Sequence, residues 1–244
     1  MELAVYEQEA KVEETHWWFV GRRQLFRREL AKLGHGPNAR ILDIGTGTGA
    51  NLRLLRQMGQ RDVTGLDSSE EAIRFCAARG LGAVQKGDVR RLPFQDGGFD
   101  IVLATDVLEH VDRDAEAASE IRRVLRPGGH ALVTVAAFRS LWGLQDVQSH
   151  HLRRYRRSSF HRLLVEAGLE VRDLYYFNYL LFPAIWGARQ AIRILKPGIK
   201  SENQVNTPML NRALGLVFSL DVATAPLVRP PFGVSILAMC RRPA

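Results

Sequence analysis

The sequence is poor in cysteine. Only Cys76 and Cys240 occur among 244 residues, far apart and without the paired spacing of a metal-binding motif. A disulfide framework and a cysteine-based zinc site are therefore not expected, whereas a reducing compartment such as the cytoplasm is. The first residues contain neither a basic segment nor an apolar run, so we expect no signal peptide.

Long apolar runs are also missing. The longest runs from Tyr175 to Trp186 and is interrupted by Asn178 and Pro183, so it is too short to span a bilayer. Hydrophobic residues make up 46% of the chain and charged residues 25%, which are ordinary globular values. The length suits one α/β domain with elaborations.

Basic residues exceed acidic ones, and the formal net charge is +8. Such an excess suits an anionic membrane surface, an anionic substrate or nucleic acid, or simply reflects frequent use of arginine. The densest basic run, from His150 to Arg157, has no stacking aromatic except Tyr155. A nucleic-acid partner is therefore not expected.

Hydrophobic patterning from residue 39 onward predicts alternating strands and helices. Strands are expected at 39–44, 62–66, 82–87, 99–104 and 130–136, with helices at 50–58, 69–79 and 114–125 between them. This order predicts a doubly wound α/β fold with a parallel sheet. Two helices, at 3–15 and 21–33, are expected before it, separated by the cluster from His16 to Phe19.

The later chain departs from simple alternation. A helix at 158–167, a strand at 170–176, a second apolar helix near 207–220 and a final strand near 233–240 are expected. We predict an N-terminal helical lid at 1–36 and a main domain at 37–244. A helical insertion at about 178–230 separates the sixth and seventh strands.

The most informative segment runs from Asp43 to Asn51 and contains Gly45, Gly47 and Gly49. It follows a short apolar strand and leads into a helix, which is the arrangement that a nucleotide-type cofactor requires. Glycines let the backbone approach a ligand, and the helix N-terminus offers free N–H groups. The spacing of Gly45, Gly47 and Ala50 also satisfies a dinucleotide fingerprint, so this turn alone does not identify the cofactor.

Two later carboxylates narrow the choice. Asp67 ends the second strand and can accept the hydroxyls of an adenosine ribose, or it caps the next helix through Ser68 and Ser69. Asp88 ends the third strand and can accept from an exocyclic amino group, while Val89 and Leu92 offer an apolar face to a purine. Dinucleotide dehydrogenases do not typically use this second pattern.

Taken together, these motifs resemble class I S-adenosylmethionine-dependent methyltransferases, in particular small-molecule enzymes of the type 11 and ubiquinone O-methyltransferase kind. The resemblance spans roughly residues 40–136. It is carried by Asp43 to Gly49, Asp67, Asp88 to Phe94, Phe99 to His110, and Val124 to Gly129.

The resemblance implies a Rossmann-like sheet of seven strands with the last antiparallel, and S-adenosyl-L-methionine as cofactor with S-adenosylhomocysteine as product. It also implies which residues bind the cofactor. The three glycines would lie against its methionine part, with Asp43 near the ammonium. Asp67 with Ser68 would bind the ribose, Asp88 with Val89 the adenine, and Thr105 and Asp106 would flank the sulfonium.

The segment from His16 to Arg23 resembles an N-terminal element of many small-molecule members, in which paired tryptophans help to cover the cofactor. Trp18 and Arg22 are then expected at the cofactor, Arg22 as a partner of the methionine carboxylate. Trp17 is expected to face the acceptor. Alternatively, the tryptophans simply pack the helix onto the sheet.

Methyl transfer needs a base that removes a proton from the acceptor. Asp106, Glu109 and His110 resemble a divalent-ion segment of ubiquinone-type enzymes, but Asp replaces the first Glu. We therefore do not favour a metal, and His110 remains a candidate catalytic residue. His150 and His151 follow the fifth strand, over the expected acceptor, and are the favoured bases.

Absent motifs narrow the reaction further. No Asn/Asp-Pro-Pro-Tyr segment and no Pro-Cys nucleophile follow the fourth strand, which argues against methylation of amino-adenine and of cytosine carbon. The aromatic insertion suits a bulky apolar acceptor, a membrane surface beside a lipid-linked one, a packed subdomain or a dimer face. Its candidate acceptor contacts, with one from the basic run, are Tyr155, Tyr179, Phe182 and Trp186.

The function predicted from the sequence is methyl transfer to a small apolar acceptor, most simply at oxygen. Transfer to nitrogen or carbon, and a non-catalytic cofactor-binding protein, are the alternatives. We expect a monomer or homodimer in the cytoplasm, with or without peripheral contact to a membrane.

Overall fold

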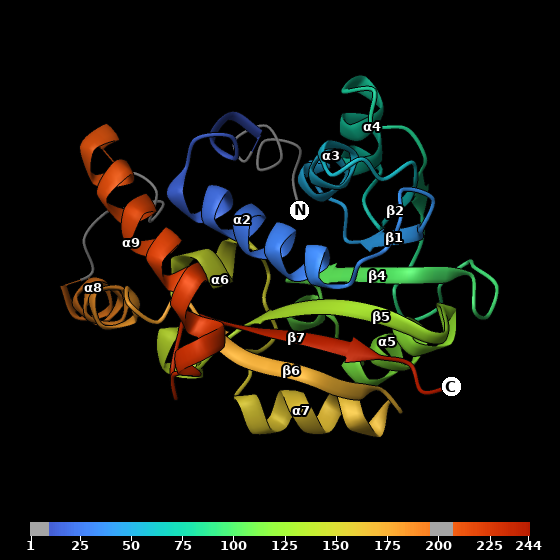
Figure 1. Ribbon diagram of the computed structural model, residues 1–244. Coiled ribbons are helices and arrows are strands. Elements are labelled where there is room, and N and C mark those ends of the chain that lie inside the picture. The colour runs from blue at the N-terminus through green and yellow to red at the C-terminus, as the bar shows by residue number, and fades with distance from the viewer. Residues whose placement is uncertain (1–9, 196–206) are drawn as a thin grey trace.

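The computed structural model describes residues 10–195 and 207–244. Its centre is one seven-stranded sheet in the order β3-β2-β1-β4-β5-β7-β6 (Figure 1). The strands are β1 (Arg40–Ile44), β2 (Asp62–Asp67), β3 (Val84–Lys86), β4 (Phe99–Thr105), β5 (Leu125–Ala136), β6 (Glu170–Phe177) and β7 (Ser235–Arg241). Only β7 runs antiparallel to its neighbours, β5 and β6. The predicted doubly wound sheet with an antiparallel last strand is confirmed.

Helices cover both faces of this sheet. The helices α2 (Trp17–Lys32), α3 (Ala50–Gln57) and α9 (Pro208–Val228) contribute to one buried apolar cluster. The helices α5 (Asp114–Val124) and α7 (Arg157–Glu166) contribute to the cluster on the other face. The helix α4 (Glu70–Ala78) lies beside β2 and β3.

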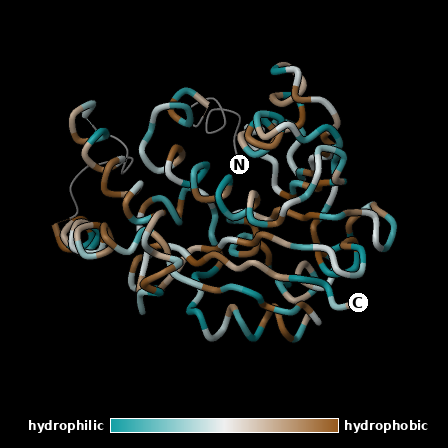
Figure 2. The backbone as a smooth tube through the Cα atoms, viewed as in Figure 1, coloured by the Kyte–Doolittle hydropathy of each residue, from teal (hydrophilic) through white to brown (hydrophobic). Residues whose placement is uncertain are grey.

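The strands are rich in buried apolar residues, so the sheet forms the centre of the hydrophobic core. Six of the seven residues of β4 are buried, as expected for a central parallel strand covered on both faces. Neighbouring residues in β1 alternate between the two clusters: Leu42 and Ile44 belong to one and Ile41 to the other. Figure 2 shows hydrophobic residues concentrated in these central strands.

The N-terminal helix starts earlier than predicted. His16 is its N-cap, and the His16 side chain accepts a hydrogen bond from the Trp18 N–H at 3.3 Å. Trp17, Trp18 and Phe19 therefore form the first turn of α2, and the break after the helical residues 10–12 lies at 13–16. In addition, α9 extends to Val228, two turns beyond its predicted end.

The insertion between β6 and β7 contains α8 (Phe182–Leu195) and α9 in its described part. The helix α9 packs on α2, with the Phe218 ring contacting both Trp17 and Trp18, so the N-terminal helix and the insertion form one layer. Within the described ranges, no helix has the length and apolar character needed to span a membrane. The short helices η1 (Leu108–His110), η2 (Arg139–Leu141) and α6 (Leu144–Gln148) complete the loops at the carboxyl ends of β4 and β5.

Candidate active site

The parallel strands end at one edge of the sheet, and the glycine turn lies there between β1 and α3. The N–H groups of Gly45 and Thr46 donate to the carbonyl of Leu66 at 2.8 and 3.2 Å, which fixes the turn against the end of β2. Gly45 has a φ of 70°, and a Cβ added there would lie 2.6 Å from Val107. Backbone conformation and packing therefore both require glycine at this position.

Asp43 lies beneath this turn and is fully buried. Its Oδ1 accepts a hydrogen bond from Asn51 Nδ2 at 2.9 Å, while Oδ2 has no partner among the described residues. Asn51 also donates to Thr105 Oγ1 at 3.0 Å, which joins the ends of β1 and β4. Burial raises the pKa of Asp43 to about 7.

An unpartnered carboxylate oxygen beside a glycine turn fits the ammonium group of S-adenosylmethionine. Buried polar atoms are normally paired, so this oxygen marks a place where a ligand donor would be stabilising. The residues present therefore fit the cofactor that the fold family implies.

Asp67 makes the helix-capping contact considered from the sequence and also holds the glycine turn. Its Oδ2 accepts from Gly47 N at 2.8 Å, and its Oδ1 accepts from Ser69 N at 2.9 Å. The carboxylate thus holds the glycine turn and the start of α4 together. Ser69 caps that helix, its Oγ accepting from Ala72 N.

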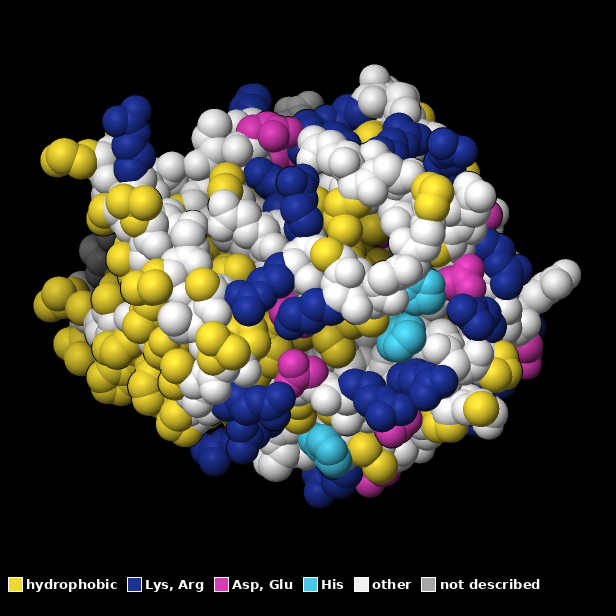
Figure 3. Space-filling view, viewed as in Figure 1, with side chains coloured by type: hydrophobic (Ala, Val, Ile, Leu, Met, Phe, Trp, Pro, Cys, Tyr) yellow, Lys and Arg dark blue, Asp and Glu magenta, His cyan; other side chains and the backbone are white. Residues whose placement is uncertain are grey.

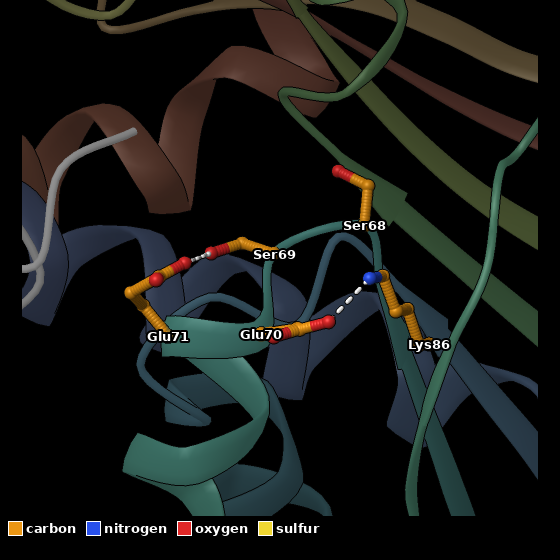
Figure 4. Close-up of a pocket in the computed structure, with 5 residues that line it drawn as sticks. All are labelled: Ser68, Ser69, Glu70, Glu71 and Lys86. Atoms are coloured by element: carbon orange, nitrogen blue, oxygen red, sulfur yellow. Dashed lines mark hydrogen bonds and ion pairs between the residues drawn. The ribbon is translucent and has the colours of Figure 1, made fainter.

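A pocket opens beside Asp67, between the start of α4 and β3, and is lined by Ser68, Ser69, Glu70, Glu71 and Lys86 (Figure 4). The walls are held by an ion pair of 2.6 Å between Lys86 and Glu70 and a hydrogen bond of 2.9 Å between Ser69 and Glu71. Ser68 points away from both of these pairs, as Figure 4 shows. Of the two predicted ribose residues, Ser68 therefore lines a polar recess.

Asp88 and Val89 follow β3, as predicted, but the Asp88 carboxylate is paired with Arg90. Arg90 Nη2 lies 2.6 Å from Asp88 Oδ2. The hydrogen bond from Arg90 lowers the pKa of Asp88, so the carboxylate is ionised. Val89 is buried in the core with Leu92. An adenine amino group would have to share Asp88 with Arg90.

Arg22 was expected to bind the methionine carboxylate of the cofactor, and in the structure it forms an ion pair with Asp106. Its Nη2 lies 2.9 Å from Asp106 Oδ2, and its guanidinium stacks over Trp18 and Phe26 at 5.7 and 5.2 Å. Thr134 Oγ1 donates to the other oxygen of Asp106 at 2.9 Å. Two candidate cofactor residues, Arg22 and Asp106, are therefore partners of each other.

A second polar cluster lies beyond β4 and contains two of the three predicted catalytic histidines. The rings of His110 and His151 meet edge to face, with centroids 4.6 Å apart. His151 Nδ1 lies 2.7 Å from Asp146 Oδ1, and Arg154 binds the same carboxylate with Nε at 2.6 Å. Leu152 N donates to the carbonyl of Glu109 at 2.8 Å, which ties this loop to the end of β4.

The members of this cluster differ in protonation state. Burial, followed by repulsion from His151, lowers the pKa of His110 to about 4, so His110 is neutral near pH 7. Burial opposes ionisation of Asp146, but hydrogen bonds from His151 and Arg154 outweigh it and hold its pKa below the usual range. A neutral histidine and an ionised aspartate therefore flank His151.

His150 is placed differently from its neighbour. It is exposed and has a φ of 55°, a conformation that turns the chain before His151. Glu109 is fully buried, and its Oε1 accepts from Ala136 N at 2.9 Å. In the part of the chain that the structure describes, no three His, Cys, Asp or Glu side chains are grouped to hold a metal ion.

The five predicted acceptor residues do not form one group. Trp17 packs edge to face on Phe218 at 5.6 Å, and the Tyr179 hydroxyl pairs with Thr224. Tyr155 is buried, with its hydroxyl bonded to Asp114. Phe182 and Trp186 lie on α8, Trp186 with 44% of its surface exposed.

Sequence reasoning missed several residues that organise the site. Asn51 had a recognisable signal, because it lies in the first turn of the helix whose N-terminus was expected to face the cofactor. Glu13 had none. It is buried and accepts hydrogen bonds from Thr48 Oγ1, from Arg53 at 2.6 Å and from Arg79 at 2.7 Å. Asn178, at the end of β6, is buried with neither amide atom partnered among the described residues.

Comparisons with known proteins agree with this geometry. Residues 42–133 match a family model described as a methyltransferase domain. A Mycolicibacterium smegmatis protein named as an S-adenosylmethionine-dependent methyltransferase is 31% identical over 164 residues, which is 66% of this chain and 62% of the relative. A fatty-acid O-methyltransferase of the same organism is 40% identical over 102 residues, 40% of this chain and 37% of the relative. A demethylmenaquinone methyltransferase of Beutenbergia cavernae is 36% identical over 132 residues, 51% and 55% of the two chains.

Solved structures show the same fold. A Haloferax volcanii protein in complex with the Trm112 methyltransferase activator has a TM-score of 0.66 at 21% identity, covering 99% of this chain and 95% of that one. The [4+2]-cyclase SpnF has a TM-score of 0.56 at 24% identity, covering 85% and 75%. The chain spans less than two thirds of the length of each of the three sequence relatives.

Residues 42–133 therefore form a methyltransferase domain, similar to S-adenosylmethionine-dependent enzymes. The family predicted from the glycine turn and the acidic strand ends is therefore confirmed.

Proposed function

We propose that this chain is an S-adenosylmethionine-dependent methyltransferase that methylates a small lipophilic acceptor at oxygen. The observation that carries the proposal is Asp43, whose buried, unpartnered Oδ2 lies beneath the glycine turn. With Gly47 and Asp67 it would hold the amino acid and ribose parts of the cofactor. When bound, the cofactor supplies an electrophilic methyl group, so the chain needs to orient an acceptor and remove its proton.

Among the three candidate histidines, we assign the proton transfer to His151. Its contact with Asp146 orients the ring and leaves Nε2 available, an arrangement typical of a general base. Asp146 is itself held by Arg154 and by Gly143 N at 2.7 Å, so the pair is rigid. His110, neutral and packed against His151, is then a positioning residue. A base suits a hydroxyl or phenol acceptor, whose proton must leave.

The acceptor class is supported by the relatives and by the aromatic insertion. The names of two relatives specify a fatty acid and demethylmenaquinone, both lipophilic molecules. Beyond the carboxyl edge, Phe138, Phe182 and Phe232 form an aromatic group, with centroids 5.7 Å apart for the first two and 5.1 Å for the last two. These rings would offer an apolar contact to such a molecule. The cytoplasm remains the predicted place of action.

The test is transfer of a labelled methyl group to a panel of long-chain fatty acids, quinols and phenols. We expect His151→Asn to lose at least about a hundredfold in turnover with cofactor affinity retained. His150→Asn changes the exposed neighbouring histidine and is the matched control, and its turnover should stay near the wild-type rate. Wild-type turnover in His151→Asn would remove the proposed base.

Product analysis distinguishes the other reactions. A methyl group found on nitrogen or carbon would refute the oxygen acceptor and keep the enzyme class. Tight cofactor binding without methyl transfer to any acceptor would favour a different use of the fold, as the cyclase similarity allows.

A further inference from the structure

The helices α8 and α9 and the loops beside them carry an unusual number of exposed apolar side chains, which we call the apolar platform. Figure 3 shows hydrophobic side chains gathered over these two helices. The large exposed members are Leu180, Trp186, Ile194, Leu195, Met209, Leu210, Leu216, Leu220, Leu227, Val228 and Phe232. Soluble proteins rarely leave so many large apolar side chains together on one surface without a binding partner.

The helix α9 has two apolar stripes. One contains Phe218, Val222 and Ala225, is buried and packs toward α2 and the sheet. The other contains Met209, Leu216 and Leu227, which are 80, 75 and 77% exposed. An ordinary surface helix has one apolar stripe, so the second requires a separate explanation.

The helix α8 is attached to the protein through polar side chains. Gln190 Nε2 donates to the carbonyl of Ser140 at 2.9 Å, and Arg193 Nη2 donates to that of Trp142 at 3.1 Å. No described residue of α8 is fully buried. Its polar side therefore faces the protein, whereas Trp186, Ile194 and Leu195 face outward.

The charges around the platform have one sign. Within 178–195 and 207–232 the acidic residue is Asp221, which is buried and accepts from the N–H groups of Asn178, Tyr179 and Leu180. The basic residues in these ranges are Arg189, Arg193, Arg212 and Arg229. Arg229 pairs with Asp173 at 2.9 Å, and the largely buried Arg189 lies 3.8 Å from Asp146, while Arg212 and Arg193 are exposed.

We infer that the apolar platform docks on an anionic lipid bilayer. Exposed leucines with an interfacial tryptophan and arginines, and with no exposed carboxylate in the ranges just given, match the chemistry of such a surface. An isologous dimer through the platform would bring the exposed Arg193 and Arg212 of both copies into one interface without an exposed carboxylate from these ranges, so a second copy is disfavoured by charge. The platform begins directly after β6, at the carboxyl edge that holds Asp43 and Asp106, so docking would bring the site close to membrane-dissolved molecules.

This inference goes beyond the proposed methyl transfer, because lipid binding is measured without turnover. Flotation of the full chain is compared between vesicles of phosphatidylcholine alone and vesicles that also contain phosphatidylglycerol. We expect binding to the mixed vesicles and little to phosphatidylcholine alone. Absence of flotation with mixed vesicles would overturn the inference, whatever the methyl-transfer assay shows.

The decisive variants keep the fold and change the surface. Leu216→Glu together with Leu220→Glu should weaken binding roughly tenfold or more, and Arg212→Gln should weaken it only with anionic vesicles. Val165→Glu on α7 and Arg61→Gln before β2 are the matched exposed controls, and both should bind as wild type. Unfolding curves and cofactor titration show whether each variant is folded.

The same variants test the rival partner. Light scattering should give the same mass for wild type and for the double glutamate variant. A wild-type dimer that dissociates in that variant would assign the platform to a second copy and overturn the lipid surface. Equal vesicle binding by the double variant and Val165→Glu would also overturn it.

Discussion

Arg22 and Asp106 form an ion pair that joins the N-terminal helix α2 to the end of β4. The two side chains are 16 and 24% exposed, and Nη2 lies 2.9 Å from Oδ2. Asp106 has a φ of 57°, which presents its carboxylate to the helix above it. Arg22 Nε is buried without a partner among the described residues. The pair therefore closes α2 over the carboxyl edge and retains one donor that a ligand carboxylate could use.

Arg22→Gln should lower both stability and cofactor affinity. It removes the ion-pair partner of a largely buried Asp106 carboxylate and leaves only the Thr134 hydroxyl bound to it, so we expect a loss of about 2 kcal/mol in the free energy of unfolding. Cofactor affinity should fall roughly tenfold, because a charge-assisted bond is lost. Urea unfolding and calorimetric titration measure the two effects. Arg27→Gln, exposed on the same helix, is the control, and equal behaviour of both variants would contradict a role for the pair.

Asp43→Asn should change how stability depends on pH. The pKa of Asp43 is raised from its usual 3.8 to about 7, mainly by burial. Because the folded state holds this proton more tightly, its stabilising contribution is complete below about pH 4 and is lost as the pH rises toward 7. The variant should therefore be more stable than wild type by about 1 kcal/mol at pH 8, with no such gain at pH 4.

The same substitution should weaken cofactor binding, since a cationic ammonium prefers the carboxylate. Wild-type affinity should rise with pH through about 7, as Asp43 ionises, and the variant should lack this rise. Titrations at pH 6 and pH 8 measure it. Asp62→Asn, exposed at the start of β2, is the control. A variant with the wild-type pH profile would show that Asp43 does not face the ligand.

Gly21→Ala should displace α2 from α9. A Cβ at Gly21 would lie 2.2 Å from the ring of Phe218, which is fully buried. We expect a loss of about 2 kcal/mol in unfolding free energy and a weaker attachment of the helix to the insertion. Gly187→Ala in α8 is the matched helical control, since nothing lies within 4 Å of its Cβ position. That control should be neutral or stabilising by about 0.5 kcal/mol, and hydrogen exchange in α2 distinguishes the two.

Glu13→Gln should loosen the chain over the glycine turn. The Glu13 side chain is only 1% exposed and is paired with both Arg53 and Arg79. Removing its charge leaves two guanidinium groups without a buried partner, so we expect a loss of about 2 kcal/mol and faster cofactor release. Glu14→Gln removes a carboxylate that is 56% exposed, and should change stability by less than about 0.5 kcal/mol. Similar losses of unfolding free energy in both variants would show that the burial of Glu13 does not increase its contribution to stability.

Local patterns made much of the fold predictable. Alternating apolar strands and helices predicted the sheet, and the glycine turn predicted the cofactor edge with Asp43 beneath it. The start of α2 was misplaced because its cap is a histidine, a residue rarely read as a helix start. The length of α9 was underestimated because its second half has Pro226 inside it, which normally predicts an earlier end.

Partner choice within the site was not predictable in the same way. Asp88 was expected to bind the adenine, but Arg90, two residues later, forms an ion pair with its carboxylate. His150 and His151 are adjacent and chemically identical, but His151 contacts Asp146 and the ring of His110, whereas His150 is exposed. Such choices depend on side-chain directions that a residue pattern does not specify.

By itself, the sequence determined the parallel sheet, the glycine turn and the family, because each depends on residues close together in the chain. The tertiary structure decided what covers the site and which groups pair there. The N–H of Trp17 donates to Asn211 Oδ1 across 194 positions, and the layer of α2 and α9 is built from such contacts. Packing between elements that are this distant depends on their shapes and on the apolar area that they bury together, which no local pattern records.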